Sequence, residues 1–212
     1  MTDHLDRLTE RYPALAACRA DLGAAVDLLA GTFRQGGKLL LCGNGGSASD
    51  CEHITGELMK GFLKRRPLPA DETTRLVAAG GEELGHAIAA RLQGALPAVS
   101  LPSCVALGTA VLNDTHGDMI YAQQVHGLGR AGDVLLGIST SGNARNVLHA
   151  CVVARARGMK TILLTGRTGG TLLPYADVAI RAPADGVVEI QEFHLPIYHA
   201  LCMELEETFF AS

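Results

Sequence analysis

The chain has 212 residues, a length that one α/β domain commonly fills, and its 48% apolar and 19% charged residues exclude general disorder. The formal net charge of −4 and the 4% of aromatic residues argue against a broad nucleic-acid-binding surface. No stretch reaches the ~18 apolar residues of a membrane helix, and residues 1–15 lack the apolar block of a signal peptide. We therefore expect a single domain over residues 1–212 that binds neither nucleic acid nor membrane.

The six cysteines are spread along the chain without a CxxC pair, and most of them lie inside apolar runs. This distribution favours neither a zinc ribbon nor a disulfide framework, because a cysteine in an apolar run behaves as a small buried hydrophobic residue. We therefore expect a soluble protein in a reducing compartment, the cytoplasm.

The first predicted element is an amphipathic helix over residues 14–34, where apolar residues recur at helical spacing. Short, continuously apolar runs follow, and segments with helical spacing lie between and after them. The apolar runs are 38–42, 98–101, 134–138, 161–164 and 178–180, and the helical segments are 48–60, 105–112, 120–129, 144–157 and 189–208. Apolar strands that alternate with helices are typical of a parallel sheet covered on both faces. The predicted fold class is therefore α/β, a three-layer sandwich.

Residues 69–96 interrupt this alternation. They contain two adjacent glycines at 80–81 and a helix-like stretch at 82–93, and the chain has similar Leu-Pro-Ala sequences on both sides. We interpret the segment as an insertion that leaves the sheet before the second strand and carries one short helix.

A glycine-rich loop follows the first predicted strand and opens a helix, with the sequence Gly43-Asn44-Gly45-Gly46-Ser47. Glycines allow a sharp turn, the N–H groups at the start of the helix favour an anion, and Ser47 adds a hydroxyl. The loop lacks the GxGxxG spacing and a following lysine, which disfavours dinucleotides and nucleoside triphosphates. An ordinary strand-to-helix turn is the alternative interpretation.

A second polar loop, Ser139-Thr140-Ser141-Gly142-Asn143, follows the third predicted strand. A helix cap with a turn would need only one of its hydroxyl groups. Because ligands of open α/β sheets bind at the carboxyl ends of strands, two such loops together predict a phosphorylated small molecule.

Two predicted helices carry polar residues at suggestive spacing. His53 and Glu57 are four residues apart and share one helix face, within reach of one ligand or metal, although a solvated helix face would look the same. Gln191 and His199 are eight residues apart and also share a face, whereas His194 points elsewhere. A surface glutamine and a core histidine in an amphipathic helix are the alternative here.

Three further residues affect the predicted helix boundaries and the predicted site. Pro196 lies inside the last helical segment and predicts a kink or a helix start at that point. Asn113 and Asp114 follow the segment 105–112 and either reach the site or form a turn.

Taken in order, these motifs resemble the sugar isomerase (SIS) domain family. The two loops alone are similar to the whole family, whereas the further presence of His53, Glu57, Gln191 and His199 is similar to its phosphoheptose isomerase members. The resemblance covers nearly the whole chain except residues 69–96.

The resemblance implies a five-stranded parallel sheet with flanking helices and a homotetramer whose sites lie between subunits, with the N-terminal helix in oligomer contacts. It implies that Glu57 and His199 move protons between C1 and C2 of a sugar phosphate through an enediol. The residues implied to bind the phosphate and sugar are Asn44, Gly45, Gly46, Ser47, Asn113, Asp114, Ser139, Thr140, Ser141 and Gln191. The implied zinc ligands, in members that bind zinc, are His53, Glu57, Gln191 and His199.

The implied reaction converts sedoheptulose 7-phosphate into D-glycero-D-manno-heptose 7-phosphate. Ala144, Gly61 and Val188 replace polar or charged residues that are common in the family, which bears on the identity of the sugar more than on the reaction. One alternative is an isomerase of another ketose phosphate. The other is a non-catalytic sugar-phosphate sensor or replication-initiator-binding factor, which would not need both Glu57 and His199.

Overall fold

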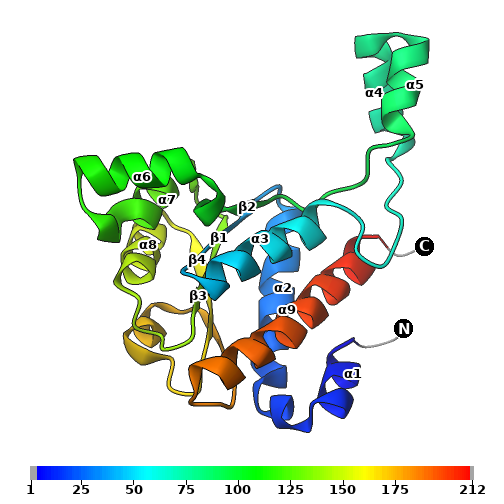
Figure 1. Ribbon diagram of the computed structural model, residues 1–212. Helices are drawn as coiled ribbons and strands as arrows, with labels where there is room; N and C mark the ends of the chain where they lie inside the picture. Colours follow the sequence, from blue (N-terminus) through cyan, green and yellow to red (C-terminus); the bar gives the residue numbers. More distant parts are fainter. Residues whose placement is uncertain (1–3, 211–212) are drawn as a thin grey trace.

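A sheet of five parallel strands forms the centre of the protein, in the order β2-β1-β3-β4-β5, with helices on both faces (Figure 1). The structure is a computed structural model that describes residues 4–210. The strands are β1 (Leu39–Gly43), β2 (Ala98–Ser100), β3 (Val134–Ser139), β4 (Lys160–Thr165) and β5 (Val178–Arg181). The predicted α/β sandwich is therefore confirmed, and each predicted apolar run is a strand to within one or two residues.

The helices lie between the strands and at the two ends of the chain. They are α1 (His4–Arg11), α2 (Arg19–Arg34), α3 (Gly46–Met59), α4 (Ala70–Gly80), α5 (Glu82–Ala89), α6 (Val105–Asp114), α7 (Ile120–Leu128), α8 (Arg145–Ala156) and α9 (Val187–Phe209). Four 3-10 turns complete the structure: η1 (Pro13–Cys18), η2 (Leu101–Ser103), η3 (Gly117–Met119) and η4 (Gly170–Tyr175). Of the helices within residues 4–210, none combines the length and the apolar character needed to cross a membrane.

The first predicted helix differs from the observed one at its start. Residues 13–18 form the turn η1, and the α-helix begins only at Arg19. Pro13 explains the change, because a proline ring fixes its own backbone and offers no N–H to the helix before it. α1 ends two residues earlier, at Arg11, and sequence spacing did not predict it.

Alternating strand residues face two separate cores. Leu39 and Leu41 of β1 pack with residues of α1, α2, α3 and α9, whereas Leu40 and Cys42 pack with residues of α7 and α8. Successive side chains of a strand point to opposite faces, so a strand covered on both sides must be apolar throughout. The sheet is thereby the rigid base that positions the loops at its carboxyl edge.

Helix α9 runs without interruption through Pro196. It begins at Val187, close to the predicted segment 189–208, so of the two alternatives predicted at Pro196, a kink or a helix start, the helix start is wrong. The buried residues Ile190, Ile197 and Leu201 lie on both sides of the proline and pack in the same core. Their burial outweighs the one backbone hydrogen bond that a proline removes.

The predicted insertion contains two helices rather than one. α4 and α5 form a helical hairpin, here called the arm (residues 70–89), which projects from the body of the molecule (Figure 1). At their crossing the helices are in close contact, since a Cβ placed on Gly85 would lie 2.4 Å from Cα of Val77. The additional helix was missed because residues 70–80 carry few strongly apolar side chains and α4 buries none of them.

Candidate functional site

The two polar loops lie next to each other at the carboxyl edge of the sheet. Strands β1 and β3 pair in register, with Gly43 opposite Ile138, so the loops that follow them begin side by side. Gly45 has φ of 56°, a conformation that favours glycine, and it leads directly into α3. Ser47 and Ser139 are buried, whereas Ser141 is exposed.

A pair of asparagines links the first loop to the helix that follows the second. The side-chain amide of Asn44 donates to Oδ1 of Asn146 at 2.9 Å, and that of Asn146 donates to Oδ1 of Asn44 at 2.8 Å. The hydroxyl of Tyr121 donates to the carbonyl of Gly43 and lies 3.3 Å from Oδ1 of Asn44. Sequence reasoning missed Asn146 and Tyr121, because neither belongs to a motif in the chain.

The second loop borders a small cavity. The hydroxyl of Ser141 accepts a hydrogen bond from the backbone N–H of Asn143 at 3.2 Å. A cavity of about 220 Å³ is lined by Thr140 and Ser141 and by Arg167, whose guanidinium is 3.2 Å from the carboxylate of Asp185. The loop therefore offers hydroxyl groups beside a cation, a combination that suits a phosphate group.

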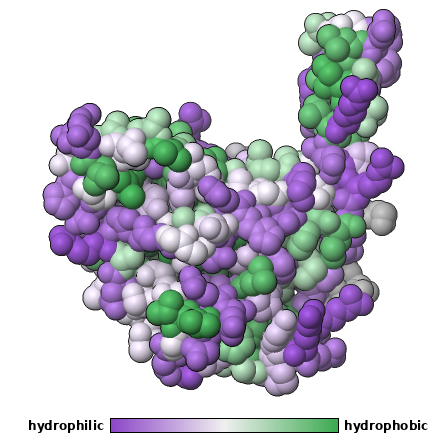
Figure 2. All heavy atoms as spheres, in the orientation of Figure 1, coloured by the Kyte–Doolittle hydropathy of each residue, from purple (hydrophilic) through white to green (hydrophobic). Residues whose placement is uncertain are grey.

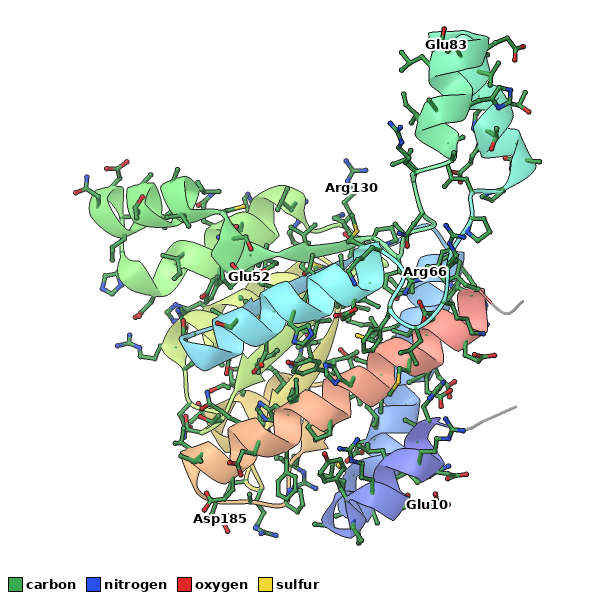
Figure 3. The ribbon with its side chains drawn as sticks, turned by 45° about the vertical axis from the view of Figure 1, so that its right-hand side comes forward. Glu10, Glu52, Arg66, Glu83, Arg130 and Asp185 are labelled. Atoms are coloured by element: carbon green, nitrogen blue, oxygen red, sulfur yellow. The ribbon has the colours of Figure 1, made fainter. Side chains whose placement is uncertain are left out.

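Helices α3 and α9 lie side by side and point in the same direction (Figure 3). Near their N-terminal ends, the Gln191 amide covers Gly46 so closely that a Cβ on Gly46 would lie 2.4 Å from Nε2 of Gln191. Two turns further along, His53 of α3 meets His199 of α9, with ring centroids 5.0 Å apart. We call this contact between the two helices the α3–α9 seam.

The seam gathers three of the predicted site residues. Nε2 of His53 is 3.2 Å from Oε1 of Glu57, whose side chain is 12% exposed. On its other edge, Nδ1 of His53 is 3.0 Å from the hydroxyl of Tyr198. His199 completes the cluster through ring contacts with both His53 and Tyr198. The structure therefore brings His53, Glu57 and His199 together within one chain.

His199 is partly buried in this cluster, which affects its pKa. Burial lowers the pKa of His199, the neighbouring His53 lowers it further, and Glu57 opposes this by raising it. Its Nε2 is buried without a hydrogen-bond partner among the described residues. The ring also lines a cavity of about 470 Å³ between α1 and α9, whose lining includes Leu8, Leu63 and Met203.

Asp50 and Tyr198 are two site residues that the sequence analysis did not select. Burial raises the pKa of Asp50, while a hydrogen bond with Tyr198 and the proximity of His53 lower it, with a net increase. Burial also raises the pKa of Tyr198, so that its hydroxyl keeps its proton. A signal existed for Asp50, which lies three residues before His53 and thus on the same helix face.

A buried ion pair anchors the C-terminal end of α3. Nε of Arg66 is 2.8 Å from Oε1 of Glu206, and both side chains are almost fully buried. The same guanidinium donates to the carbonyls of Leu58 and Glu57 at 2.7 and 3.0 Å. These carbonyls belong to the last turn of α3 and have no partner within the helix, so Arg66 holds the turn that carries Glu57.

The remaining predicted residues lie away from the seam. Asn113 and Asp114 are exposed at the end of α6, which packs on α7 and η3, and the Asn113 amide donates to Asp114 at 2.8 Å. His194 is fully buried, and burial lowers its pKa to about 4. Its orientation away from the site agrees with the sequence analysis.

The phosphate loops and the histidine cluster are separated along α3. Glu57 follows Ser47 by ten residues, and a helix rises by 1.5 Å per residue, so the two lie about 15 Å apart along the axis. Within residues 4–210 of one chain, no group of three or more His, Cys, Asp or Glu side chains is close enough to hold a metal ion.

Comparison with known proteins identifies the family. The family described as "SIS domain" matches residues 4–95 and 84–166. A phosphoheptose isomerase of Thiobacillus denitrificans is 38% identical over 208 residues, which cover 93% of this chain and 92% of the relative.

Solved structures agree with this similarity. A phosphoheptose isomerase from Neisseria gonorrhoeae is 32% identical with a TM-score of 0.74, covering 96% of this chain and 93% of the other. The structure from Francisella tularensis is 30% identical with a TM-score of 0.73, covering 98% of this chain and 100% of the other. The chain therefore belongs to the sugar isomerase (SIS) domain family.

Proposed function

We propose that this protein is a phosphoheptose isomerase, which converts sedoheptulose 7-phosphate into D-glycero-D-manno-heptose 7-phosphate. The observation that carries the proposal is the meeting of Glu57 and His199 at the α3–α9 seam of a chain with two phosphate-binding loops. Relatives that bear this name match more than nine tenths of the chain. A protein that only senses a sugar phosphate would need the loops but not the acid–base pair.

In the proposed reaction, a base removes a proton from C1 of the ketose while an acid protonates the oxygen on C2, which forms an enediol. A proton then returns to C2 and the hydroxyl on C1 loses its proton, so the aldose has the same atoms as the ketose. A carboxylate and an imidazole suit these transfers, and we assign them to Glu57 and His199. The loop residues Ser47, Ser139, Thr140 and Ser141 would hold the phosphate.

We propose zinc as the cofactor, with His53, Glu57 and His199 as ligands that must move closer together than in this structure, where no three such side chains of the described residues can hold a metal ion. Two imidazoles and a carboxylate are a common zinc ligand set, and the unpartnered buried Nε2 of His199 fits a ligand role. When bound, zinc would polarise the oxygens of the sugar. Gln191 is the proposed fourth ligand, although its amide lies against Gly46 within this single chain.

We also propose that the active sites form between subunits of a homotetramer. The rise of about 15 Å from Ser47 to Glu57 along α3 supports this arrangement, because a loop of a second copy could bring the phosphate closer to Glu57 than the loop of the same chain does. The phosphate loops of one copy would then face Glu57 and His199 of another copy. Asn113 and Asp114, exposed on α6, would contact the sugar from a neighbouring copy.

We further propose a cytoplasmic location. All six cysteines are free thiols and five of them are buried. Free thiols of this kind are typical of reducing compartments.

The decisive experiment is proton NMR of the purified protein with sedoheptulose 7-phosphate in D2O, first with added zinc and then with a chelator. We expect an aldose anomeric signal with deuterium incorporated at C2, and loss of conversion in the chelator. Phosphate-competitive binding without conversion would instead favour a different ketose phosphate. Absence of both binding and conversion would favour the non-catalytic alternative.

The variant Glu57→Gln tests the assigned acid–base pair in the same assay. Turnover should fall at least ~100-fold while folding and phosphate affinity stay near normal, because only a proton-transfer group is lost. Glu52→Gln is the matched control, since Glu52 lies on the same helix but is exposed and contacts Ser103. Unchanged turnover in Glu57→Gln would contradict the assignment.

Mixed oligomers test the shared site. The double variant Thr140→Ala/Ser141→Ala and the variant Glu57→Gln should each be nearly inactive alone. When the two are unfolded and refolded together, partial recovery of turnover is expected, because some sites combine an intact loop with an intact Glu57. If every site belonged to one chain, mixing would restore nothing.

A further inference from the structure

The carboxylate of Glu57 has a charged partner on the oxygen that His53 does not contact. Nζ of Lys60 is 3.1 Å from Oε2 of Glu57, whereas Nε2 of His53 is 3.2 Å from Oε1. Glu57 and Lys60 are three residues apart at the end of α3, a spacing that brings two side chains to the same helix face. Among residues 4–210, no other side chain bonds to Oε2, so each carboxylate oxygen has its own partner.

Exposed ion pairs between residues three apart on a helix usually contribute little to stability. This pair differs from them in two ways. Glu57 is only 12% exposed, although Lys60 is 57% exposed, so the carboxylate end of the pair is largely shielded from water. The same ammonium also donates to the backbone carbonyl of Gly61 at 3.1 Å, which fixes two of its three N–H donors.

The backbone at Gly61 is itself held in place. Its N–H donates to Oε1 of Gln93 at 2.7 Å, and a Cβ at this position would overlap the backbone carbonyl of Lys64. The turn is therefore too tight for any side chain at position 61. Lys60 has extended backbone, with φ of −142° and ψ of 174°, so the chain leaves the helix here while the side chain of Lys60 reaches back to Glu57.

A glutamate carboxylate needs partners on both oxygens to keep a fixed plane. Its last side-chain torsion, χ3, has a broad energy profile, so a single contact leaves the carboxylate free to turn. A base must keep one orientation relative to the C–H bond that it attacks, and a misplacement of 1 Å can cost about 100-fold in rate. The contacts from His53 and Lys60 together supply this constraint.

We propose that Lys60 is a positioning residue that fixes the plane of the Glu57 carboxylate for proton transfer. The inference rests on the role of Glu57 in the proposed function, and it adds a residue that no motif of the sequence selected. Lys60 is assigned no contact with the substrate and acts through Glu57 alone.

The first measurement is steady-state kinetics of substituted proteins with sedoheptulose 7-phosphate. Lys60→Met removes the ammonium but keeps most of the side chain. Its kcat should fall about 10-fold while KM stays nearly unchanged, because the phosphate loops remain intact. Lys60→Arg restores a cationic donor and should recover most of the lost kcat. Lys160→Met is the matched control with unchanged kcat, since Lys160 is 59% exposed and pairs with Asp177 at the start of β4.

Two kinetic results would contradict the inference. A raised KM with unchanged kcat in Lys60→Met would show that Lys60 binds the substrate rather than positions the base. An equal loss of kcat in Lys60→Met and Lys60→Arg would show that the cationic donor is not what matters at this position. Circular dichroism establishes that each variant is folded.

The second measurement does not depend on activity. Crystal structures of wild type and Lys60→Met should show one orientation of the Glu57 carboxylate in wild type and a turned or second orientation in the variant. If wild type converts no sugar, the proposed function fails, and these structures still decide whether Lys60 fixes Glu57. An unchanged carboxylate in Lys60→Met would overturn the inference.

Discussion

The α3–α9 seam and the arm are joined by one short stretch of chain, yet they are held in opposite ways. At the C-terminal end of the seam, the buried charges of Arg66 and Glu206 pair with each other. The carboxylate of Glu206 accepts from Arg66 and from the backbone N–H groups of Phe62, Leu63 and Lys64. The end of α3 is therefore fixed where it carries Glu57.

The arm is held by far fewer contacts with the rest of the protein. α4 and α5 pack against each other and make no comparable contact with another described helix or strand. Leu84 and Ile88 are 56% and 37% exposed, and Figure 2 shows apolar surface along the arm. At its base, Gly94 donates to the carbonyl of Arg66, and Gly61 donates to the side chain of Gln93.

The contrast between the seam and the arm shows a place where an insertion can enter this fold without displacing the residues of the candidate site. The arm leaves the body after Arg66 and returns before Leu96, and Arg66 already secures the last turn of α3. Whatever the arm does, the position of Glu57 depends on residues outside it.

Arg66→Ala should lower the free energy of unfolding by about 3–5 kcal/mol, because it leaves the buried carboxylate of Glu206 without its charge partner. Urea denaturation at one fixed protein concentration measures this loss. Arg75→Ala is the matched change in the arm, where the pair with Asp71 is exposed at both residues. Its effect should stay below about 1 kcal/mol. Equal losses of unfolding free energy in Arg66→Ala and Arg75→Ala would contradict the expected difference between the seam and the arm.

Acid should weaken the seam through Glu206. Burial raises the pKa of Glu206, but the N–H groups of Phe62 and Leu63 and the Arg66 guanidinium lower it more, so the pKa lies below its ordinary value of 4.5. A carboxyl group whose pKa is lower in the folded than in the unfolded protein stabilises the fold at a pH above its unfolded-state pKa. This stabilisation is lost as the pH falls through the pKa of the folded state.

The free energy of unfolding of wild type and Glu206→Gln, measured from neutral to acidic pH, checks this expectation. The difference between them should be largest near neutral pH and shrink as the pH falls below 4.5. Glu83→Gln at the tip of the arm is the control, because Glu83 points into solvent (Figure 3). A difference for Glu206→Gln that does not change with pH would contradict the prediction.

Gly85→Ala should loosen the arm alone. The added Cβ would lie 2.4 Å from the backbone of Val77, so α4 and α5 must separate, at a cost of about 1–3 kcal/mol for overpacking. Amide hydrogen exchange within residues 70–89 should become faster, while exchange in the sheet stays unchanged. Gly80→Ala is the matched control, since its Cβ would meet other atoms only at 3.7 Å. Faster exchange throughout the protein would show that the arm supports the body.

The sheet could be predicted from the sequence because its strands are buried on both faces. A strand such as β3, apolar from Val134 to Ile138, has no other stable place than the inside of a sandwich. The arm was predicted only as an insertion, because α4 buries no side chain and leaves a weak pattern. The helix around Pro196 was predicted, but a helix start at the proline remained an alternative, because local propensity does not register the burial on both sides of it.

The residues of the candidate site also fall into those that the sequence could predict and those that it could not. Gly45, Ser47, Ser141, His53 and Glu57 are close to one another in sequence or belong to recognisable motifs, and local geometry alone places them on loops and on one helix face. Tyr198 and Asp50 come from helices separated by more than a hundred residues, and only the packing of α9 on α3 joins them. Local spacing and apolar pattern were enough to predict the five strands and most of the helices that cover them, but not α1 or α4. Only the tertiary structure decided which side chains form hydrogen bonds with one another, because these bonds depend on distances between elements that no local sequence pattern encodes.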